Sequence, residues 1–415
     1  MEISVLNGKS IDKKCVLFLL LMGILIVPFL KGFITDINGD QGLVFIGRAT
    51  NYMADYYNVA EYAADRNPYG YGREEEIVDA AERAYPPLAY LIAYYQSKAA
   101  DYLNLSGLQA GRTDLGVATS AFFMFFAAGW YILLLYDSIK KPPLYKVLIL
   151  LCLMLSGIFI FSYERGNNIF LTALCSSFFV LHYNSRNKVT AECACIALAF
   201  AAGLKVYPAL LGILLLFDKN YKAALRLIIY GIAFGFLPFL FFKGGFSNIP
   251  LLLSNLQVSS DTYAMLVFPR FNFRYWASQI ADSGTKMAVY RIMSGINMVF
   301  CCGAVAASYF QKEHWKRIVL LLLVLMIFPV NSAQYAGLYL FVGIVLFLNE
   351  EKWSLPDVVY LLLTVLILNP FQVVFHGYNC TTWAMNFAAS AMLILLLAET
   401  LHERISFLIR TKYRR

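Results

Sequence analysis

Charged residues are scarce in this sequence. Asp, Glu, Lys and Arg together make up 14% of its 415 residues, whereas hydrophobic residues make up 60%. This composition excludes an ordinary soluble domain and is typical of a protein with many membrane spans. No small-residue cleavage site follows the hydrophobic run from Val16 to Leu30, so we expect that run to be the first span and not a removable signal peptide.

The sequence also lacks the common signatures of metal, nucleotide and disulfide chemistry. Its 4 histidines are scattered, without the neighbouring Cys or carboxylate residues of a zinc site. It has no Gly-x-Gly-x-x-Gly in a strand-turn-helix setting and no Gly-rich phosphate loop that ends in Lys-Ser or Lys-Thr. The 8 cysteines lie mostly within hydrophobic runs, and we expect no disulfide framework and no structural zinc.

Internal repeats, low-complexity tracts and Pro-rich or Ser-rich linkers are absent as well. Without such boundaries the chain offers no second folding unit. We therefore expect residues 1–415 to form a single integral membrane domain.

The net charge of +8 is spread over short connections between hydrophobic runs. Under the positive-inside rule such connections lie in the cytoplasm and orient the chain in a plasma membrane. We predict no nucleic-acid partner, and we expect the basic tail from His402 to Arg415 to lie on anionic membrane lipid. The basic connections are Lys13-Lys14, Lys140-Lys141 with Lys146, Arg186 with Lys188, Lys219 with Lys222, Lys316-Arg317, and Arg410 to Arg415.

One long stretch breaks the hydrophobic pattern. From Ile34 to Asp114 the chain carries 12 carboxylates against 6 Lys and Arg. A bundle embedded in lipid gains nothing in stability from so many acids, so we expect residues 34–114 to form an extracytoplasmic loop that handles a substrate. A second extracytoplasmic loop is expected at residues 244–285.

Polar breaks interrupt several hydrophobic runs, and their positions set the topology. Because cytoplasmic loops enclose an even number of crossings, we divide Thr190 to Phe217 and Ile318 to Leu348 into short helices. This predicts an all-α fold, a polytopic transmembrane helical bundle of about 12 spans with both termini in the cytoplasm. Every break then faces outward, where we expect a polar cavity. The breaks are Glu164-Arg165-Gly166-Asn167-Asn168, Gly203 to Pro208, Pro329 to Gln334 and His376-Gly377-Tyr378-Asn379.

Two short helices are expected within the acidic loop. Tyr52 to Arg66 can form a helix with Asp55 near its start, where an acid stabilises the helix dipole without any further role. After Tyr85, a Pro-Pro pair opens an apolar run from Ala89 to Tyr95 that is short for a membrane crossing. We expect an interfacial or re-entrant helix there.

These segments resemble the multi-span glycosyltransferases of the GT-C superfamily, in particular glycosyltransferase family 87, which includes polyprenol-phosphate-mannose-dependent mannosyltransferases. The resemblance covers most of the chain and rests on the order of the motifs relative to the spans. Many members have Gly-Gln where this chain has Gly166-Asn167, which preserves an amide. The motifs are Asp55-Tyr56-Tyr57 with Asn67-Pro68-Tyr69, Tyr85-Pro86-Pro87-Leu88, Glu164-Arg165-Gly166-Asn167, and Gly203-Leu204-Lys205-Val206-Tyr207-Pro208.

The resemblance implies a hexosyltransferase that moves a sugar from a polyprenyl-phosphate donor to a hydroxyl of a lipid or glycan acceptor at the outer membrane face. A lipid-carried donor also explains why the sequence has no nucleotide-binding motif. A sugar hydroxyl is a poor nucleophile, so the acceptor needs a general base within hydrogen-bond reach. Asp55 is the first candidate, and Asp36 and Asp40 compete with it. Some related enzymes use a divalent cation, which one of these acids would hold.

A leaving phosphate needs fixed cations at membrane depth, and Lys205 and Arg165 suit that role. The alternative for Lys205 is that it snorkels to the interface or pairs with Glu164. Arg270 and Arg274 alternate with aromatic rings in the second outer loop, a pattern that suits a sugar or a lipid phosphate and equally suits an interfacial belt. Further candidates for substrate binding are Asn167, Tyr85, Gln334 and His376.

Two other functions compete with this interpretation. A transporter or flippase also uses broken helices and buried charges around a central site. The large acidic loop has no counterpart in the second half of the chain, which favours a one-sided active site. A surface-polysaccharide polymerase or ligase shares the lipid-linked chemistry and stays open.

Overall fold

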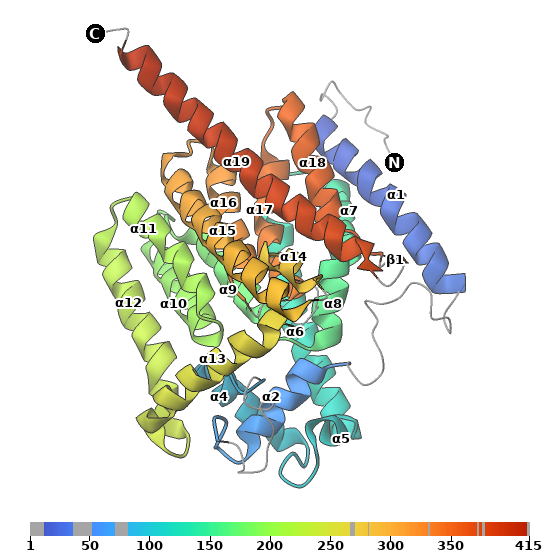
Figure 1. The fold of residues 1–415 in the computed structure, drawn as a ribbon, viewed down its shortest axis with the longest axis vertical. Helices are drawn as coiled ribbons and strands as arrows, with labels where there is room; N and C mark the ends of the chain where they lie inside the picture. The colour runs from blue at the N-terminus through green and yellow to red at the C-terminus, as the bar shows by residue number, and fades with distance from the viewer. Residues whose placement is uncertain are drawn as a thin grey trace, which may run out of the picture.

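The computed structural model describes residues 12–35, 52–70, 82–265, 270–280, 282–330, 333–371, 373–375 and 378–412. Over these residues the chain is a bundle of helices with one pair of two-residue strands (Figure 1). The helical fold predicted from the composition and the hydrophobic runs is therefore confirmed for this part of the chain.

The first half contains the two helices expected in the acidic loop. The one with Asp55 in its first turn is α2, and the one that begins at Pro87 after Pro86 is α4. The elements up to the middle of the chain are α1 (Lys13–Thr35), α2 (Ala54–Ala64), α4 (Pro87–Gln96), η1 (Ser97–Ala99), α5 (Gly107–Gly111), α6 (Asp114–Ser138), α7 (Pro143–Met154), α8 (Gly157–Arg165), α9 (Ile169–His182), α10 (Lys188–Leu204), η2 (Tyr207–Gly212) and α11 (Ile213–Phe217).

The second half has fewer but longer helices. Its elements are α12 (Tyr221–Phe236), η3 (Leu237–Phe241), η4 (Gly245–Ser247), α13 (Asn248–Met265), α14 (Arg274–Ser278), α15 (Ser283–Phe310), α16 (His314–Ile327), η5 (Gln334–Tyr339), α17 (Leu340–Asn349), α18 (Leu355–Ile367), β1 (Val374–Phe375), β2 (Tyr378–Asn379) and α19 (Cys380–Lys412).

Five of these helical segments are long and apolar enough to cross a membrane, and the bent pair α7 and α8 would make a sixth span. The bend between α7 and α8 is 59°. Four shorter apolar segments lie among them, so the predicted number of about 12 spans stays a prediction. The five segments are Lys13–Gly32, Asp114–Ser138, Tyr221–Phe241, Gly284–Phe310 and Cys380–Phe407.

The two long hydrophobic runs are broken where the sequence predicts. α10 ends at Leu204, and the chain continues as η2 with Pro208 in its first turn. α16 ends at Ile327, before Pro329, and regular structure resumes at Gln334 in η5. Proline lacks a backbone N–H and cannot continue the hydrogen-bond ladder of the preceding helix, which explains both positions.

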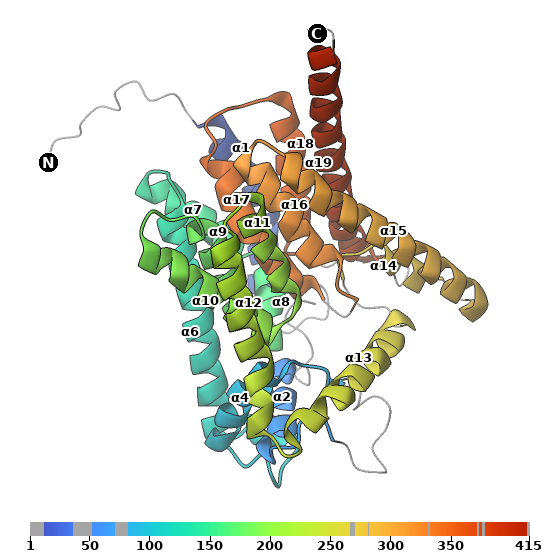
Figure 2. The same cartoon turned by 90° about the vertical axis from the view of Figure 1, so that its left-hand side faces the viewer.

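The helices sort into a buried centre and an outer layer. α16 is buried on all sides, and α17 nearly so, as expected for helices that are hydrophobic all round. The candidate spans are buried over only 17% to 50% of their most apolar windows, so they present their remaining apolar surface outward. α2, α4 and α5 lie at one end of the bundle, opposite the start of α1 and the end of α19 (Figure 2).

A buried ion pair joins α1 to α18 at the end of the bundle opposite α2, α4 and α5. The Lys14 ammonium lies 3.6 Å from an Asp357 carboxylate oxygen, and both side chains are less than a tenth exposed. Lys14 also lies 4.5 Å from the centre of the Phe347 ring. Removing one partner of a buried ion pair lowers the free energy of unfolding, because the other charge is left buried and unpaired.

We expect Lys14→Met to lower the free energy of unfolding by roughly 3–5 kcal/mol, because it leaves the Asp357 carboxylate buried without its partner. Intrinsic tryptophan fluorescence during thermal unfolding in detergent measures this. Lys13→Met, at an exposed neighbouring position, is the matched control and should have little effect. The double variant Lys14→Met with Asp357→Asn should recover stability; if it is no more stable than Lys14→Met, the pair does not carry the effect.

Candidate functional site

Asp55 lies in the first turn of α2, at the end of the bundle that α2, α4 and α5 occupy. Met53, the residue immediately before α2, has a left-handed backbone with φ of 55°. Its N–H donates a hydrogen bond of 2.6 Å to the carbonyl oxygen of Glu164. The start of α2 is thus held directly on the turn between α8 and α9, by which we mean the segment Glu164 to Asn168, including the last two residues of α8.

Both oxygens of the Asp55 carboxylate bind that turn. Oδ1 pairs with the Arg165 guanidinium, and Oδ2 accepts a hydrogen bond of 2.7 Å from Asn167 Nδ2. Asn167 Oδ1 in turn accepts from the N–H of Ile169, at 3.0 Å, at the start of α9. A carboxylate oxygen has two acceptor sites, so each keeps one for a further donor. Asp55 is therefore held in a fixed position but is still able to accept a proton.

Gly166 allows α2 to approach the turn this closely. It has a φ of +65°, in the left-handed region that favours glycine. A side-chain Cβ at this position would lie 2.8 Å from Met53 Sδ and 3.1 Å from Met53 Cα. Both the backbone conformation and the space thus require glycine.

Lys205 follows the last residue of α10 and is only 8% exposed. Its ammonium lies 5.1 Å from the centre of the Tyr85 ring and 5.1 Å from the centre of the Tyr335 ring. Rings at that range attract a cation through their negative faces. Within the part of the chain that the structure describes, Lys205 forms no salt bridge, and the two rings together with the nearby charge of Asp55 stabilise its ammonium.

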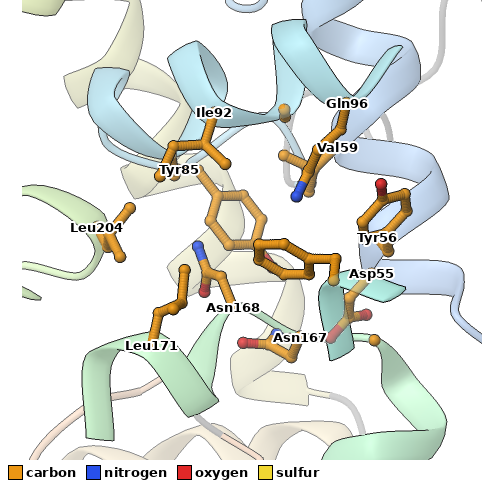
Figure 3. Close-up of a pocket in the computed structure, with 14 residues that line it drawn as sticks. Asp55, Tyr56, Val59, Tyr85, Ile92, Gln96, Asn167, Asn168, Leu171 and Leu204 are labelled. Carbon is orange, nitrogen blue, oxygen red and sulfur yellow. Dashed lines mark hydrogen bonds between the residues drawn. The ribbon is translucent and has the colours of Figure 1, made fainter. Parts of the chain in front are cut away.

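A small cavity of about 30 Å³ opens beside Asp55 (Figure 3). One wall carries polar side chains, among them Asp55, Asn167 and Asn168. The other wall is mostly apolar and comes from α4, α6, α9 and Leu204 at the end of α10. Tyr85 also lines the cavity, so its ring contacts both this space and Lys205.

The tyrosine hydroxyls at this end of the bundle stay protonated. Burial raises the pKa of Tyr85 well above its ordinary value, and the nearby Asp55 charge raises it further. Burial likewise raises the pKa of Tyr56 above its ordinary value. Both side chains can therefore donate a hydrogen bond at neutral pH.

The structure brings together five of the residues that the sequence singles out, from four separate segments. Asp55, Tyr85, Arg165, Asn167 and Lys205 all lie around the cavity or in contact with its lining. Segments that lie up to 150 residues apart in the chain (205 minus 55) thus meet at one site.

Three other predicted residues do not line the cavity: Arg270 lies before α14, Arg274 begins α14, and Gln334 begins η5. Arg270 is fully buried and donates from Nη1 to the Tyr263 carbonyl oxygen at 3.1 Å. Arg274 donates to the hydroxyl of Ser294 at 2.9 Å and to a backbone carbonyl at 3.0 Å. Gln334 Nε2 lies 3.3 Å from a threonine hydroxyl of α19. Their groups contact the protein itself, and their role as substrate ligands stays a prediction.

Asp36, Asp40 and His376 lie outside the described residues. Within the described residues, no group of three or more His, Cys, Asp and Glu side chains is placed to hold a metal ion. Whether a divalent cation takes part therefore stays open.

Two residues of the site were not selected from the sequence. Tyr335, in η5, brings the second half of the chain to Lys205, and its ring stacks on Phe161 with a centroid distance of 6.2 Å. Asn168 lines the cavity beside Asn167. Asn168 lies in a break that the sequence shows and Tyr335 directly follows one, but nothing in the sequence says which side chain there points inward.

Comparison with known proteins adds no identification: no model of a protein family matches the sequence, and no curated protein matches it.

We expect Gly166→Ala to lower the midpoint of thermal unfolding and to weaken the docking of α2. A non-glycine residue in the left-handed region costs about 1–2 kcal/mol, and the added methyl overlaps Met53. Gly129→Ala is the matched control, because a Cβ there meets nothing within 4 Å. Equal midpoints for the two variants, measured by tryptophan fluorescence, would contradict the proposed contact.

Proposed function

We propose that this protein is a membrane glycosyltransferase. It transfers a hexose from a polyprenyl-phosphate donor to a hydroxyl of a lipid or glycan acceptor, without a nucleotide. The observation that supports this most strongly is the convergence of one fixed carboxylate, two cations and a cavity at one end of a helical bundle with membrane-spanning helices.

In this reaction Asp55 is the general base. One of its free acceptor sites takes the proton of the acceptor hydroxyl, whose oxygen bonds to the anomeric carbon of the sugar. The bond from that carbon to the phosphate oxygen breaks, and the phosphate leaves with the electron pair. Because the nucleophile and the leaving group lie on opposite sides of the carbon, the configuration inverts.

Lys205 is the cation for the leaving phosphate. Among the described residues its ammonium contacts two aromatic rings and forms no salt bridge, so it can gain a phosphate oxygen without giving up an ion pair. Burial excludes water around it and strengthens the attraction to an anion. Arg165 is engaged by Asp55 and contributes by holding that carboxylate in place.

The site lies on the outer face of a plasma membrane in this proposal, and both termini lie in the cytoplasm. Basic connections gather at the opposite end of the bundle, where Lys141 pairs with Asp12 just before α1. Under the positive-inside rule that end is cytoplasmic. The end with α2, α4 and α5 is then extracytoplasmic, where a lipid-carried donor is accessible.

A transporter or flippase is the second candidate, and one feature favours it. The two broken runs, α10 with η2 and α16 with η5, meet where Lys205 contacts Tyr335. Broken helices around a buried charge are typical of transporter sites. A surface-polysaccharide polymerase or ligase would use the same lipid-linked chemistry.

The test is transfer of radiolabelled sugar in membranes, with a panel of synthetic polyprenyl-phosphate sugars as donors. We expect Asp55→Asn to reduce transfer by about 10²–10⁴-fold, the usual contribution of a general base. Lys205→Met should lower the rate through the loss of leaving-group stabilisation. Asp65→Asn, at the exposed C-terminal end of the same helix, should transfer normally.

Asp36→Asn and Asp40→Asn belong in the same series. If one of them abolishes transfer while Asp55→Asn does not, the base is that residue. If the folded wild-type protein transfers sugar from no donor in the panel, the glycosyltransferase proposal fails. Assays of lipid flipping and of glycan chain length then decide between the remaining functions.

A further inference from the structure

Asn168 occupies the N-cap position of α9 without capping it. An Asn there usually accepts a hydrogen bond from the first turn through its side chain, but Asn168 makes no such bond. The neighbouring Asn167 accepts the N–H of Ile169 instead. The Asn168 side chain therefore does not serve as the helix cap.

Asn168 lines the cavity, and its Oδ1 atom is buried without a hydrogen-bond partner among the described residues. Figure 3 shows the Asn168 side chain between Tyr85 and Leu171. The Tyr56 hydroxyl is likewise buried without a partner, and Tyr56 lines the same cavity. Native structures rarely leave buried polar atoms unpaired, because each costs about 1–3 kcal/mol. Because both residues line one cavity, a hydroxyl-bearing ligand there could supply the missing bonds.

The chemical character of the cavity limits that ligand. Asp55 is the one charged residue among the described residues that line it, and its charge is already balanced by Arg165. Amide and phenol groups supply the remaining polarity, next to an apolar wall from α4. Such a lining suits hydroxyl groups attached to an apolar ring face, and it offers no cation to a phosphate.

Lys205 is not among the residues that line this cavity, but its ammonium contacts the ring of Tyr85, which does line it, and the ring of Tyr335. We propose that Tyr85 separates two subsites: a neutral one at Asn168 and Tyr56, which binds a hydroxyl-bearing group of the acceptor, and a cationic one at Lys205, which binds the phosphate. This assignment rests on the proposed glycosyltransferase function. Asp55 lines the same cavity as the neutral subsite, and a general base must lie there to take the proton of the acceptor hydroxyl.

The size of the neutral subsite sharpens the proposal. The cavity is small, about 30 Å³, and has room for a water-sized polar group. The structure therefore assigns to it one arm of the acceptor, of the size of a hydroxymethyl or a ring hydroxyl. Asn168 Oδ1 accepts the hydrogen bond of that hydroxyl.

Binding measurements can test the two subsites without any catalysis. The full-length protein in nanodiscs is titrated with methyl glycosides of glucose, galactose and mannose by saturation-transfer NMR, and with farnesyl phosphate by calorimetry. We expect Asn168→Leu to weaken binding of the methyl glycosides by about tenfold, the usual effect of losing one buried hydrogen bond. The same variant should leave farnesyl phosphate binding within about twofold of the wild type.

Lys205→Met should show the converse pattern, with weaker farnesyl phosphate binding and unchanged glycoside binding. Asn168→Asp is the control for folding, because its carboxylate oxygens can still accept the hydrogen bond, and glycoside binding should be retained. A deoxy analogue that lacks the contacting hydroxyl should bind the wild type and Asn168→Leu equally.

Several results overturn the assignment: no methyl glycoside binds the wild type, Asn168→Leu binds all of them normally, or both variants weaken both ligands. The outcome is separate from that of the proposed function. If sugar transfer is demonstrated but Asn168→Leu leaves the acceptor KM unchanged, the neutral subsite is wrong and the function stands. If the two ligands separate as expected but no donor supports transfer, the subsites stand and the transferase proposal falls.

Discussion

The attachment of Asp55 to the turn between α8 and α9 is the constraint on which the site depends. Arg165 and Asn167 each bind one carboxylate oxygen, and Gly166 provides the close approach. Arg165 ends α8, and Gly166 and Asn167 follow it in the connection to α9, so the acid is fixed by the bundle and not by its own loop. A charged group held from two sides in a partly buried place keeps its geometry as a ligand arrives.

The buried Lys205 is the third charged side chain at this end of the bundle, beside Asp55 and Arg165. Asp55 and Arg165 neutralise one another, and Lys205 adds one positive charge that two tyrosine rings hold. An ammonium at such depth is expensive unless an anion arrives, because the rings replace only part of its hydration. Together these three side chains carry a net charge of +1, which attracts an anion to Lys205.

Much of this arrangement could be predicted from the sequence. Pro208 and Pro329 mark the broken runs, and a carboxylate in the acidic loop together with an amide and two cations in the breaks indicates a site. The inward direction of Tyr335 and Asn168 could not be predicted, because it depends on how the breaks pack. Arg270 and Arg274 donate hydrogen bonds to backbone carbonyls and a hydroxyl of the protein itself, and their role as substrate ligands stays a prediction. The number of spans stays undetermined because short apolar helices resemble both core and membrane segments.

The hydrogen bond from Met53 to Glu164 has a consequence for how this protein can vary. Because α2 is held on the α8–α9 turn, the position of Asp55 does not depend on the length of the chain between α1 and α2. Loop closure costs grow only slowly with length. Insertions and deletions in that stretch can therefore accumulate during evolution while the carboxylate keeps its place, which makes spacing from the N-terminus a poor guide for aligning this acid among distant proteins.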